Sequence, residues 1–320
     1  MARSVIIATG SYLPARVVTN DVLAEKVDTS DAWIRERTGI ITRHLAAENE
    51  TTSDMALAAA RRALTAAGLD AQAIDGIVVA TSTPDTTMPS VASKLQSALG
   101  SRGGPALDVV AACTGFVAAL SVAHGWLETG LARNVLVIGA ESMSRIIDWN
   151  DRTTCILFGD GAGAVILARK EDESRRGILA LQLESDGALG TILGTSGGVS
   201  TTQTAGFLFM EGQEVFRHGV EKMSSVTRAA VAKAGLALSD VTWVVAHQAN
   251  ARMIIAIARQ LKLPPERFIV TLDRHANTSA ASIPLALDAA VRDGRIAQGD
   301  ILALPALGAG LTWGCCVICW

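Results

Sequence analysis

Short apolar runs alternate along this chain with longer alanine-rich segments in which apolar residues recur at helical spacing. The runs hold almost no polar residues, which is typical of strands covered by helices on both faces. They occupy residues 77–80, 106–110, 135–138, 164–167, 244–246 and 301–304. The helical segments occupy residues 52–67, 91–98, 116–129, 215–234, 251–261 and 283–292. This alternation predicts a layered α/β fold.

Segments of the first half of the chain recur in the same order in the second half. Residues 66–79 resemble 233–245 at an offset of 167, residues 134–138 resemble 300–304 at 166, and residues 113–130 resemble 277–294 at 164. Chance similarity of apolar runs is the alternative, but three segments that keep their order at a nearly constant offset favour a pseudo-repeat. We therefore expect two similar halves, with Cys113 and Asn277 at equivalent points.

Two stretches lack any apolar periodicity. The charged segment 170–176 predicts an exposed turn, and we place the boundary between the halves there, giving residues 1–172 and 173–320. Residues 187–206 are rich in Gly, Ser and Thr with few charges, which predicts a long loop or flap near a site.

Composition narrows the class of protein. The 320 residues are 49% hydrophobic and 18% charged, which is enough apolar material for a large core. A net charge of −3 provides no general basic surface for nucleic acid, so anionic partners must meet local Arg and Lys clusters. The N-terminus has too short an apolar run for a signal peptide and no stretch is long enough to span a membrane. We expect a cytoplasmic protein.

Five cysteines are present, an odd number without a zinc-like spacing. Cys315, Cys316 and Cys319 near the C-terminus leave open a redox or zinc-binding tail. A buried final strand that uses cysteine as a small hydrophobic residue is the simpler interpretation. Neither this group nor any other spacing predicts a metal site.

Three side chains are the candidates for chemistry. Cys113 lies where an apolar run ends and a helix of small residues begins, a position that favours the thiolate. His247 and Asn277 also follow extended segments, so the three can converge at equivalent strand ends. Singly, each has a structural explanation: a core cysteine, a satisfied histidine and a helix-capping asparagine. His275 is a rival to His247, but its place two residues before Asn277 suits a turn.

Together with the glycine-rich segment 308–314, these motifs resemble the β-ketoacyl-acyl-carrier-protein synthase III family, the initiating condensing enzymes of type II fatty-acid synthesis. The resemblance is collinear from residue 10 to the C-terminus. It implies a thiolase-like fold: two βαβαβ halves in five α-β-α-β-α layers, assembled as a homodimer. It also implies an acyltransferase that condenses an acyl-CoA primer with malonyl-acyl carrier protein, releasing coenzyme A and carbon dioxide and giving 3-oxoacyl-acyl carrier protein.

The resemblance assigns a role to each reactive group. Cys113 would carry the acyl group as a thioester, and His247 and Asn277 would donate hydrogen bonds to the malonyl thioester oxygen as an enolate develops. Backbone amides of Cys113 and Ala309 would form an oxyanion hole. No metal or redox cofactor is implied, because the coenzyme A thioesters are substrates.

Further positions match the family's substrate contacts. The resemblance implies coenzyme A contacts at Trp33, Arg37, Arg152, Phe216 and Asn250, an acyl pocket at Met88, Met143 and Phe158, and carrier-protein docking at Arg252, Arg259 and Lys262. Stacking of Trp33 on adenine and forked Arg contacts to phosphate fit this physically. Surface packing, ordinary ion pairs and a solvated helix face are the alternatives.

The sequence departs from the family pattern at three points. Ala309 replaces the middle glycine of a triple glycine, Ala276 replaces the glycine before the catalytic asparagine, and Met88 stands where a large aromatic often closes the acyl pocket across the dimer. Primer preference is therefore open. Alternatives to the expected function are a secondary-metabolism acyltransferase or condensing enzyme with another acceptor, a cysteine thioesterase that uses Cys113 and His247, and a noncatalytic binding protein of the same fold.

Overall fold

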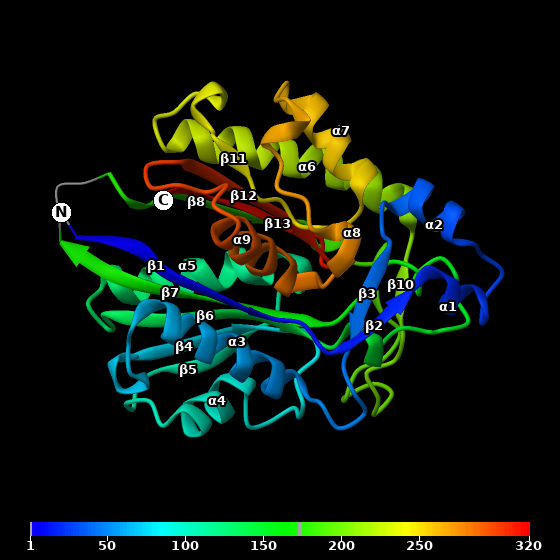
Figure 1. Cartoon of the computed structure of the whole chain (residues 1–320), viewed down its shortest axis with the longest axis horizontal. Helices are drawn as coiled ribbons and strands as arrows, with labels where there is room; N and C mark the ends of the chain where they lie inside the picture. Colours follow the sequence, from blue (N-terminus) through cyan, green and yellow to red (C-terminus); the bar gives the residue numbers. More distant parts are fainter. Residues whose placement is uncertain (1, 172–174) are drawn as a thin grey trace.

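Two β-sheets form the centre of the molecule in the computed structural model, which describes residues 2–171 and 175–320 (Figure 1). The first sheet runs in the order β1 (Ala2–Tyr12), β7 (Gly161–Glu171), β6 (Asn134–Glu141), β4 (Gly76–Ala80), β5 (Ala106–Val109). The second runs β8 (Gly177–Ser185), β13 (Thr312–Cys319), β12 (Ile301–Gly308), β11 (Trp243–Val244). The strands of the first sheet thus precede residue 172 and those of the second follow residue 176. The predicted boundary at residues 172 and 173 lies outside the described residues.

The two sheets repeat one pairing pattern. In the first, β4 pairs parallel with β6, and β7 pairs antiparallel with both β6 and β1. In the second, β11 pairs parallel with β12, and β13 pairs antiparallel with both β12 and β8. The position of β5 is taken in the second sheet by an isolated parallel bridge between Val244 and Phe268. The predicted pseudo-repeat is therefore present in the structure.

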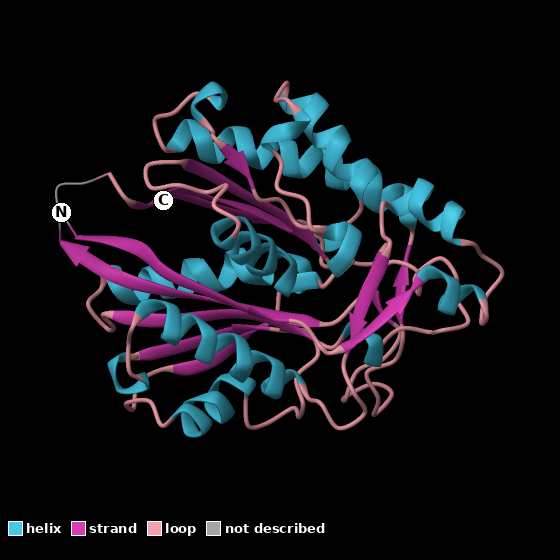
Figure 2. Cartoon of the chain, in the orientation of Figure 1, coloured by secondary structure: helices cyan, strands magenta, loops and turns pink. Residues whose placement is uncertain are grey.

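Helices cover both sheets and separate them, which gives five layers (Figure 2). Outside the first sheet lie α3 (Thr52–Ala67) and α4 (Val91–Leu99); between the sheets lie α5 (Gly115–Glu128) and α9 (Ser282–Arg292); outside the second sheet lies α6 (Gly212–Lys233), with α7 (Ala251–Leu261) packed on it. Because both faces of each sheet are covered, the central strands are apolar along their length. The predicted thiolase-like α-β-α-β-α architecture is confirmed.

The repeat differs from the expected alignment at the helices between the sheets. α5 begins at Gly115 and α9 at Ser282, an offset of 167, but α9 has 11 residues against 14 for α5. The single 3₁₀ turns before them, η2 (Ala112–Thr114) and η7 (Ser279–Ala281), keep that same offset. The structural counterpart of Cys113 is therefore Ala280. The predicted pairing of Cys113 with Asn277 is wrong by three positions. The prediction matched the C-terminal ends of the two helices, and α9 is three residues shorter than α5.

Short helices and strands from both halves gather at one end of the layered core (Figure 1). They are β2 (Arg16–Thr19), α1 (Asn20–Ala24), α2 (Asp31–Thr38), β3 (Thr42–Leu45), β9 (Leu193–Thr195), β10 (Leu208–Met210) and α8 (Leu272–His275). Residues 187–206 were expected to form a loop, but they include β9, which pairs antiparallel with β10. The short strand was missed because only its partner across the hairpin defines it.

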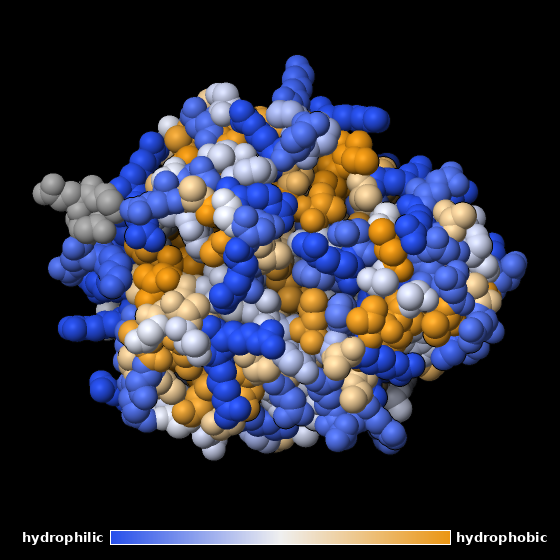
Figure 3. Space-filling view, viewed as in Figure 1, coloured by the Kyte–Doolittle hydropathy of each residue, from blue (hydrophilic) through white to orange (hydrophobic). Residues whose placement is uncertain are grey.

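The core and the surface match the composition. β13 buries Cys315, Cys316 and Cys319 as free thiols, so these residues form a core strand and not a redox tail. The face drawn in Figure 3 is largely hydrophilic, with apolar patches between the charged side chains. Within the described residues, no helix has the length and hydrophobicity needed to cross a bilayer.

Candidate active site

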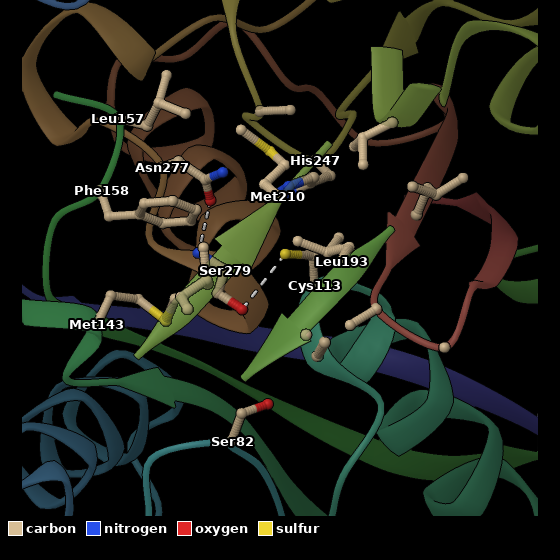
Figure 4. A pocket seen from close by; sticks show the side chains of 18 of the residues that line it. Ser82, Cys113, Met143, Leu157, Phe158, Leu193, Met210, His247, Asn277 and Ser279 are labelled. Atoms are coloured by element: carbon tan, nitrogen blue, oxygen red, sulfur yellow. Dashed lines mark hydrogen bonds between the residues drawn. The ribbon is translucent and has the colours of Figure 1, made fainter. Parts of the chain in front are cut away.

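A cavity of about 600 Å³ opens between the two halves. The β9–β10 hairpin contributes Leu193 and Met210 to its wall, so the segment predicted to be a flap does border the site (Figure 4). Eight of the predicted site residues line the cavity: Cys113, Met143, Phe158, Phe216, His247, Asn250, Asn277 and Ala309. The structure therefore brings together the three candidate reactive groups from both halves.

Cys113 occupies η2, between the end of β5 and the start of α5. The preceding residue, Ala112, has φ +45°, a left-handed conformation that turns the chain sharply into the helix. Gly308 at the end of β12 lies directly behind this turn, and a Cβ there would sit 2.7 Å from the Cys113 amide nitrogen. A side chain at position 308 would push Cys113 out of place, so glycine is required for this close approach.

The protonation state of Cys113 differs from the expectation. Burial raises the pKa of the thiol to about 12, and the hydrogen bond with Ser279 only partly offsets this. The Sγ atom donates to Ser279 Oγ at 3.4 Å. Burial around Cys113 therefore opposes the effect expected from its position before α5, which would favour the thiolate. The raised pKa favours the neutral thiol near neutral pH, so a nearby proton acceptor would assist attack by Cys113.

His247 is held as a neutral imidazole. Its Nδ1 atom lies 2.7 Å from Ser282 Oγ, at the first residue of α9. That same oxygen accepts the Gln248 amide proton at 3.3 Å. The Ser282 hydroxyl can donate to Nδ1, and in that tautomer the imidazole proton is on Nε2. Burial lowers the His247 pKa to about 4. His247 can therefore present a neutral N–H donor near neutral pH.

Asn277 is fixed by its backbone and by one side of its amide. Its N–H donates to Leu157 O at 2.9 Å and its carbonyl accepts from Gly159 N–H at 3.0 Å, which ties it to the segment of Phe158. Its Oδ1 accepts from Ser279 N–H at 2.9 Å, so the amide nitrogen is left as a donor. Like His247, it can offer a hydrogen bond without bringing a charge.

The segment before Asn277 explains the second histidine. His275 is buried but does not line the cavity, so the rivalry with His247 is resolved against it. Ala276 has φ +57° and ψ −163°, a conformation that only glycine adopts without strain. The departure from the family's glycine therefore falls at a strained residue that turns Asn277 into the cavity.

Glu141 is a functional candidate that sequence reasoning missed. It ends β6, is fully buried, and accepts from Thr83 Oγ1 at 2.6 Å, Ser82 N–H at 3.0 Å and Ser279 Oγ at 3.1 Å. Burial raises its pKa to about 7. The signal in the sequence was a carboxyl group at the end of an otherwise apolar strand. Burying such a group costs free energy, so its presence there suggests a functional role.

The predicted coenzyme A contacts divide into two groups. Trp33 on α2 has Arg37 and Arg152 over its ring, with guanidinium carbons 5.6 and 5.4 Å from the ring centroid. This surface cluster does not line the cavity, although α2 packs against α7 beside it. Phe216 and Asn250 do line the cavity, and Asn250 Oδ1 also caps α7 through Met253 N–H at 2.8 Å.

The remaining predicted residues lie on the surface. Met88 is 79% exposed and does not line the cavity of its own chain. Arg252 and Arg259 are exposed on α7, and Lys262 follows its end as the left-handed cap. Ala309, in the β12–β13 turn, borders the cavity and follows Gly308, the residue that lies against the Cys113 backbone. These roles stay predictions.

Comparison with known proteins identifies the family. The family described as 3-oxoacyl-[acyl-carrier-protein (ACP)] synthase III matches residues 107–187, and its C-terminal counterpart matches residues 231–320. The β-ketoacyl-[acyl-carrier-protein] synthase III of Rhodospirillum centenum is 55% identical over 320 residues, covering 99% of each chain.

Solved structures agree with the sequence match. The 3-oxoacyl-[acyl-carrier-protein] synthase III of Aquifex aeolicus superposes with a TM-score of 0.94 at 43% identity, covering 99% of this chain and 100% of that one. The priming β-ketosynthase of a polyketide biosynthetic pathway gives 0.92 at 35% identity, covering 99% and 96%. The sequence and structure matches cover almost the whole chain, including the cavity that holds the candidate nucleophile and the two neutral donors. The chain belongs to the 3-oxoacyl-[acyl-carrier-protein] synthase III family.

Proposed function

We propose that this protein is an acyltransferase that initiates type II fatty-acid synthesis. It condenses an acyl-CoA primer, acetyl-CoA or a similar short acyl-CoA, with malonyl-acyl carrier protein. The single observation that carries this is the presence of Cys113, His247 and Asn277 on the wall of one cavity in a chain of this family. The products are 3-oxoacyl-acyl carrier protein, coenzyme A and carbon dioxide.

The first half-reaction loads the primer onto Cys113. The sulfur attacks the thioester carbonyl carbon, the new carbon–sulfur bond forms, and the bond to the coenzyme A sulfur breaks. The thiol proton leaves Cys113 and the departing coenzyme A thiolate takes up one proton, so the step is balanced. Backbone amides at Cys113 and Ala309 would stabilise the oxyanion of the tetrahedral intermediate.

The second half-reaction forms the carbon–carbon bond. The malonyl carboxylate leaves as carbon dioxide, and its bonding electrons form an enolate whose oxygen accepts hydrogen bonds from His247 and Asn277. Neutral donors suit this task, because a carboxylate in their place would repel the developing charge. The enolate carbon attacks the acyl carbon on Cys113 and the cysteine sulfur leaves. No step in this scheme requires a metal or redox cofactor.

A homodimer is part of the proposal. β5 is an edge strand of the first sheet, and exposed apolar side chains cluster on it and beside it: Leu107 at 39%, Val110 at 76% and Met88 at 79%. An exposed apolar strand edge is a liability in a monomer and a template for pairing with a second copy. Met88 would then reach the acyl pocket of the partner and not its own.

The binding of the two substrates is proposed to use separate surfaces. The stacked cluster of Trp33, Arg37 and Arg152 would hold the nucleotide end of coenzyme A, with Phe216 and Asn250 along the entrance to Cys113. Arg252, Arg259 and Lys262 would meet an acidic carrier protein through local charge, because the chain as a whole carries a net charge of −3. A cytoplasmic location remains part of this prediction.

The test is a panel of acyl-CoA primers assayed with malonyl-acyl carrier protein, with the product identified by mass. We expect a 3-oxoacyl-acyl carrier protein two carbons longer than the primer. Free fatty acid without a new carbon–carbon bond would instead identify a thioesterase. The resemblance to a priming β-ketosynthase of a polyketide pathway favours one second candidate, a secondary-metabolism enzyme with another acceptor. Loading of Cys113 without condensation onto malonyl-acyl carrier protein would support that candidate.

A further inference from the structure

Glu141 is a buried carboxyl group that faces hydrogen-bond donors. Thr83 Oγ1 accepts from Ser142 N–H at 2.8 Å, so its own proton points to Glu141 at 2.6 Å. Ser82 N–H and the Ser279 hydroxyl donate at 3.0 and 3.1 Å, and Thr81 Oγ1 makes a longer hydrogen bond of 3.4 Å. Within the described part of the chain, no Lys, Arg or His forms an ion pair with it. These donors suit an ionised carboxylate, which can only accept hydrogen bonds. They bring no positive charge to balance it.

Ser279 connects this carboxyl group to the candidate nucleophile. Its Oγ atom accepts from Cys113 Sγ at 3.4 Å and donates to Glu141 Oε1 at 3.1 Å. Figure 4 shows Ser279 between Asn277 and Cys113, with its hydroxyl turned toward the sulfur. The backbone of Ser279 has φ +50°, a conformation that is uncommon for serine.

His247, which lines the cavity with Cys113, is a weaker candidate to accept the thiol proton. His247 Nδ1 is already hydrogen-bonded with Ser282 Oγ, and burial lowers the His247 pKa to about 4, whereas burial raises that of Glu141 to about 7. The charge of Glu141 also raises the Cys113 pKa. Two buried acids this close favour a single shared proton, so the thiolate is stabilised when that proton is on Glu141.

We propose that Ser279 and Glu141 form a proton relay that activates Cys113 for acyl loading. As the sulfur attacks the primer carbonyl, the thiol proton passes to Ser279 Oγ and the Ser279 hydroxyl proton passes to Glu141 Oε1. The relay runs in reverse to return one proton toward the departing coenzyme A thiolate. Glu141 is thus a positioning residue that acts through Ser279. The relay rests on the proposed acyl loading, and His247 and Asn277 are left free for the enolate.

The first experiment measures alkylation of Cys113 by iodoacetamide between pH 6 and 9, which needs neither coenzyme A nor carrier protein. Among the described residues, the titratable group coupled to Glu141 is Cys113 on η2, and Glu141 otherwise faces hydroxyls and amides from the segment after β4 and from η7. We expect the wild-type rate to level off above pH ~7, once Glu141 is ionised and can accept the proton. In Glu141→Gln the rate should be lower at pH 7 and rise about tenfold per pH unit, as for an unassisted thiol of raised pKa.

The opposite outcome is equally clear. If Glu141 acts only as a nearby negative charge, its removal lowers the Cys113 pKa and alkylation becomes faster at pH 7. Faster or unchanged alkylation in Glu141→Gln therefore overturns the relay. The result also stands apart from the proposed function, because a relay can be present in a protein that fails to condense its substrates.

A second variant distinguishes loss of the proton relay from a general effect on folding. Ser279→Ala keeps the buried carboxyl group and the backbone hydrogen bond to Asn277, but it breaks the proton path. We expect acyl loading from acetyl-CoA to fall about 10²-fold in either single variant and no further in the double variant, since the residues act as one unit. Additive losses would contradict this.

Two controls complete the design. Asp160→Asn alters another buried carboxyl group, which accepts from Ser144 and Ala46 N–H, and it should leave alkylation of Cys113 unchanged. Malonyl decarboxylation, measured in the Cys113→Ala background, should change less than about threefold when Glu141→Gln is added, because that step uses the other donors. An equal loss in both half-reactions would show a structural role and overturn the relay.

Discussion

The same sharp turn occurs twice in this molecule, once in each half. Ala112 and Ser279 occupy matched positions of the repeat, both precede a helix between the sheets, and both have positive φ values of +45° and +50°. In the first half the reactive group is on the following residue, Cys113. In the second half the following residue is Ala280, and the polar side chain is on Ser279 itself. The fold thus supplies one geometry twice and the sequence uses it for two tasks.

The position of Asn277 extends the comparison. Its counterpart at the same offset in the first half is Val110, which lines the cavity with an apolar side chain. In the pair Cys113 and Ala280 the reactive side chain is in the first half, and in the pair Val110 and Asn277 it is in the second half. This teaches that the repeat predicts where the reactive groups gather, but not which member of each pair is reactive.

The largest effects are expected from variants that remove the reactive side chain of one half at a time. Cys113→Ala should abolish covalent acyl labelling from acetyl-CoA and leave measurable malonyl decarboxylation, whereas Asn277→Ala should keep labelling and lose decarboxylation about 10²–10³-fold. Radiolabelled acetyl transfer and carbon dioxide release measure the two half-reactions. Labelling that persists in Cys113→Ala would show that the nucleophile lies elsewhere.

A charge reversal on the second half's outer surface should have the next largest effect. Arg252→Glu should raise the KM for malonyl-acyl carrier protein about tenfold and weaken its salt dependence, because surface charges govern encounter more than chemistry. Loading of Cys113 should stay nearly intact. Arg61→Glu on α3 is the matched control, an exposed arginine on the opposite outer layer. An equal loss in both half-reactions would point to misfolding or to a coenzyme A contact.

The pH dependence of decarboxylation tests the second half alone. The His247 pKa is lowered to about 4 by burial, so the imidazole remains a neutral donor as the pH falls from 8 to 5.5. Decarboxylation in Cys113→Ala should therefore vary less than about twofold over that range and decline only as the pH approaches 4. A decline with a midpoint near the ordinary histidine value of about 6.5 would contradict the neutral-donor assignment.

A change at the edge of the first half should alter selectivity modestly. Met88→Trp should depress longer or branched primers severalfold relative to acetyl-CoA, because a rigid ring replaces a flexible side chain that can refill irregular space. Met88 is exposed in its own chain, so the effect requires the proposed dimer. Leu131→Trp, at another exposed apolar position, is the control. An unchanged chain-length profile in Met88→Trp would remove Met88 from the acyl pocket.

The sequence predicted the layers well, because continuous apolar runs and alanine-rich periodic segments each have one common structural outcome. β4, β6, α3 and α7 lie within a few residues of their predicted positions. β8 was missed because its solvent-facing polar residues interrupt the apolar run, and β9 because three residues carry no pattern of their own. Short strands are defined by partners distant in sequence, which local patterns do not contain.

The candidate site was predictable only where a side chain is reactive by itself. Cys113, His247 and Asn277 could be found from residue type and resemblance, and all three line the cavity. The state of Cys113 could not be found, because its pKa depends on burial between two halves that the sequence does not place. The link from Cys113 through Ser279 to Glu141 spans residues 113 to 279 and exists only after folding.

The smallest expected effect concerns backbone strain in the second half. Ala276 holds φ +57° and ψ −163°, which costs an L-residue on the order of 1–3 kcal/mol, whereas its first-half counterpart, Val109, lies in the regular strand β5. Ala276→Gly should relieve this strain, offset in part by the greater freedom of glycine in the unfolded chain, for a net stabilisation of about 1 kcal/mol. Urea unfolding of the two proteins measures the difference, and Val109→Gly should instead destabilise. A less stable Ala276→Gly would mean that the alanine methyl, which is fully buried beside Leu272, contributes more through packing than the strained backbone costs.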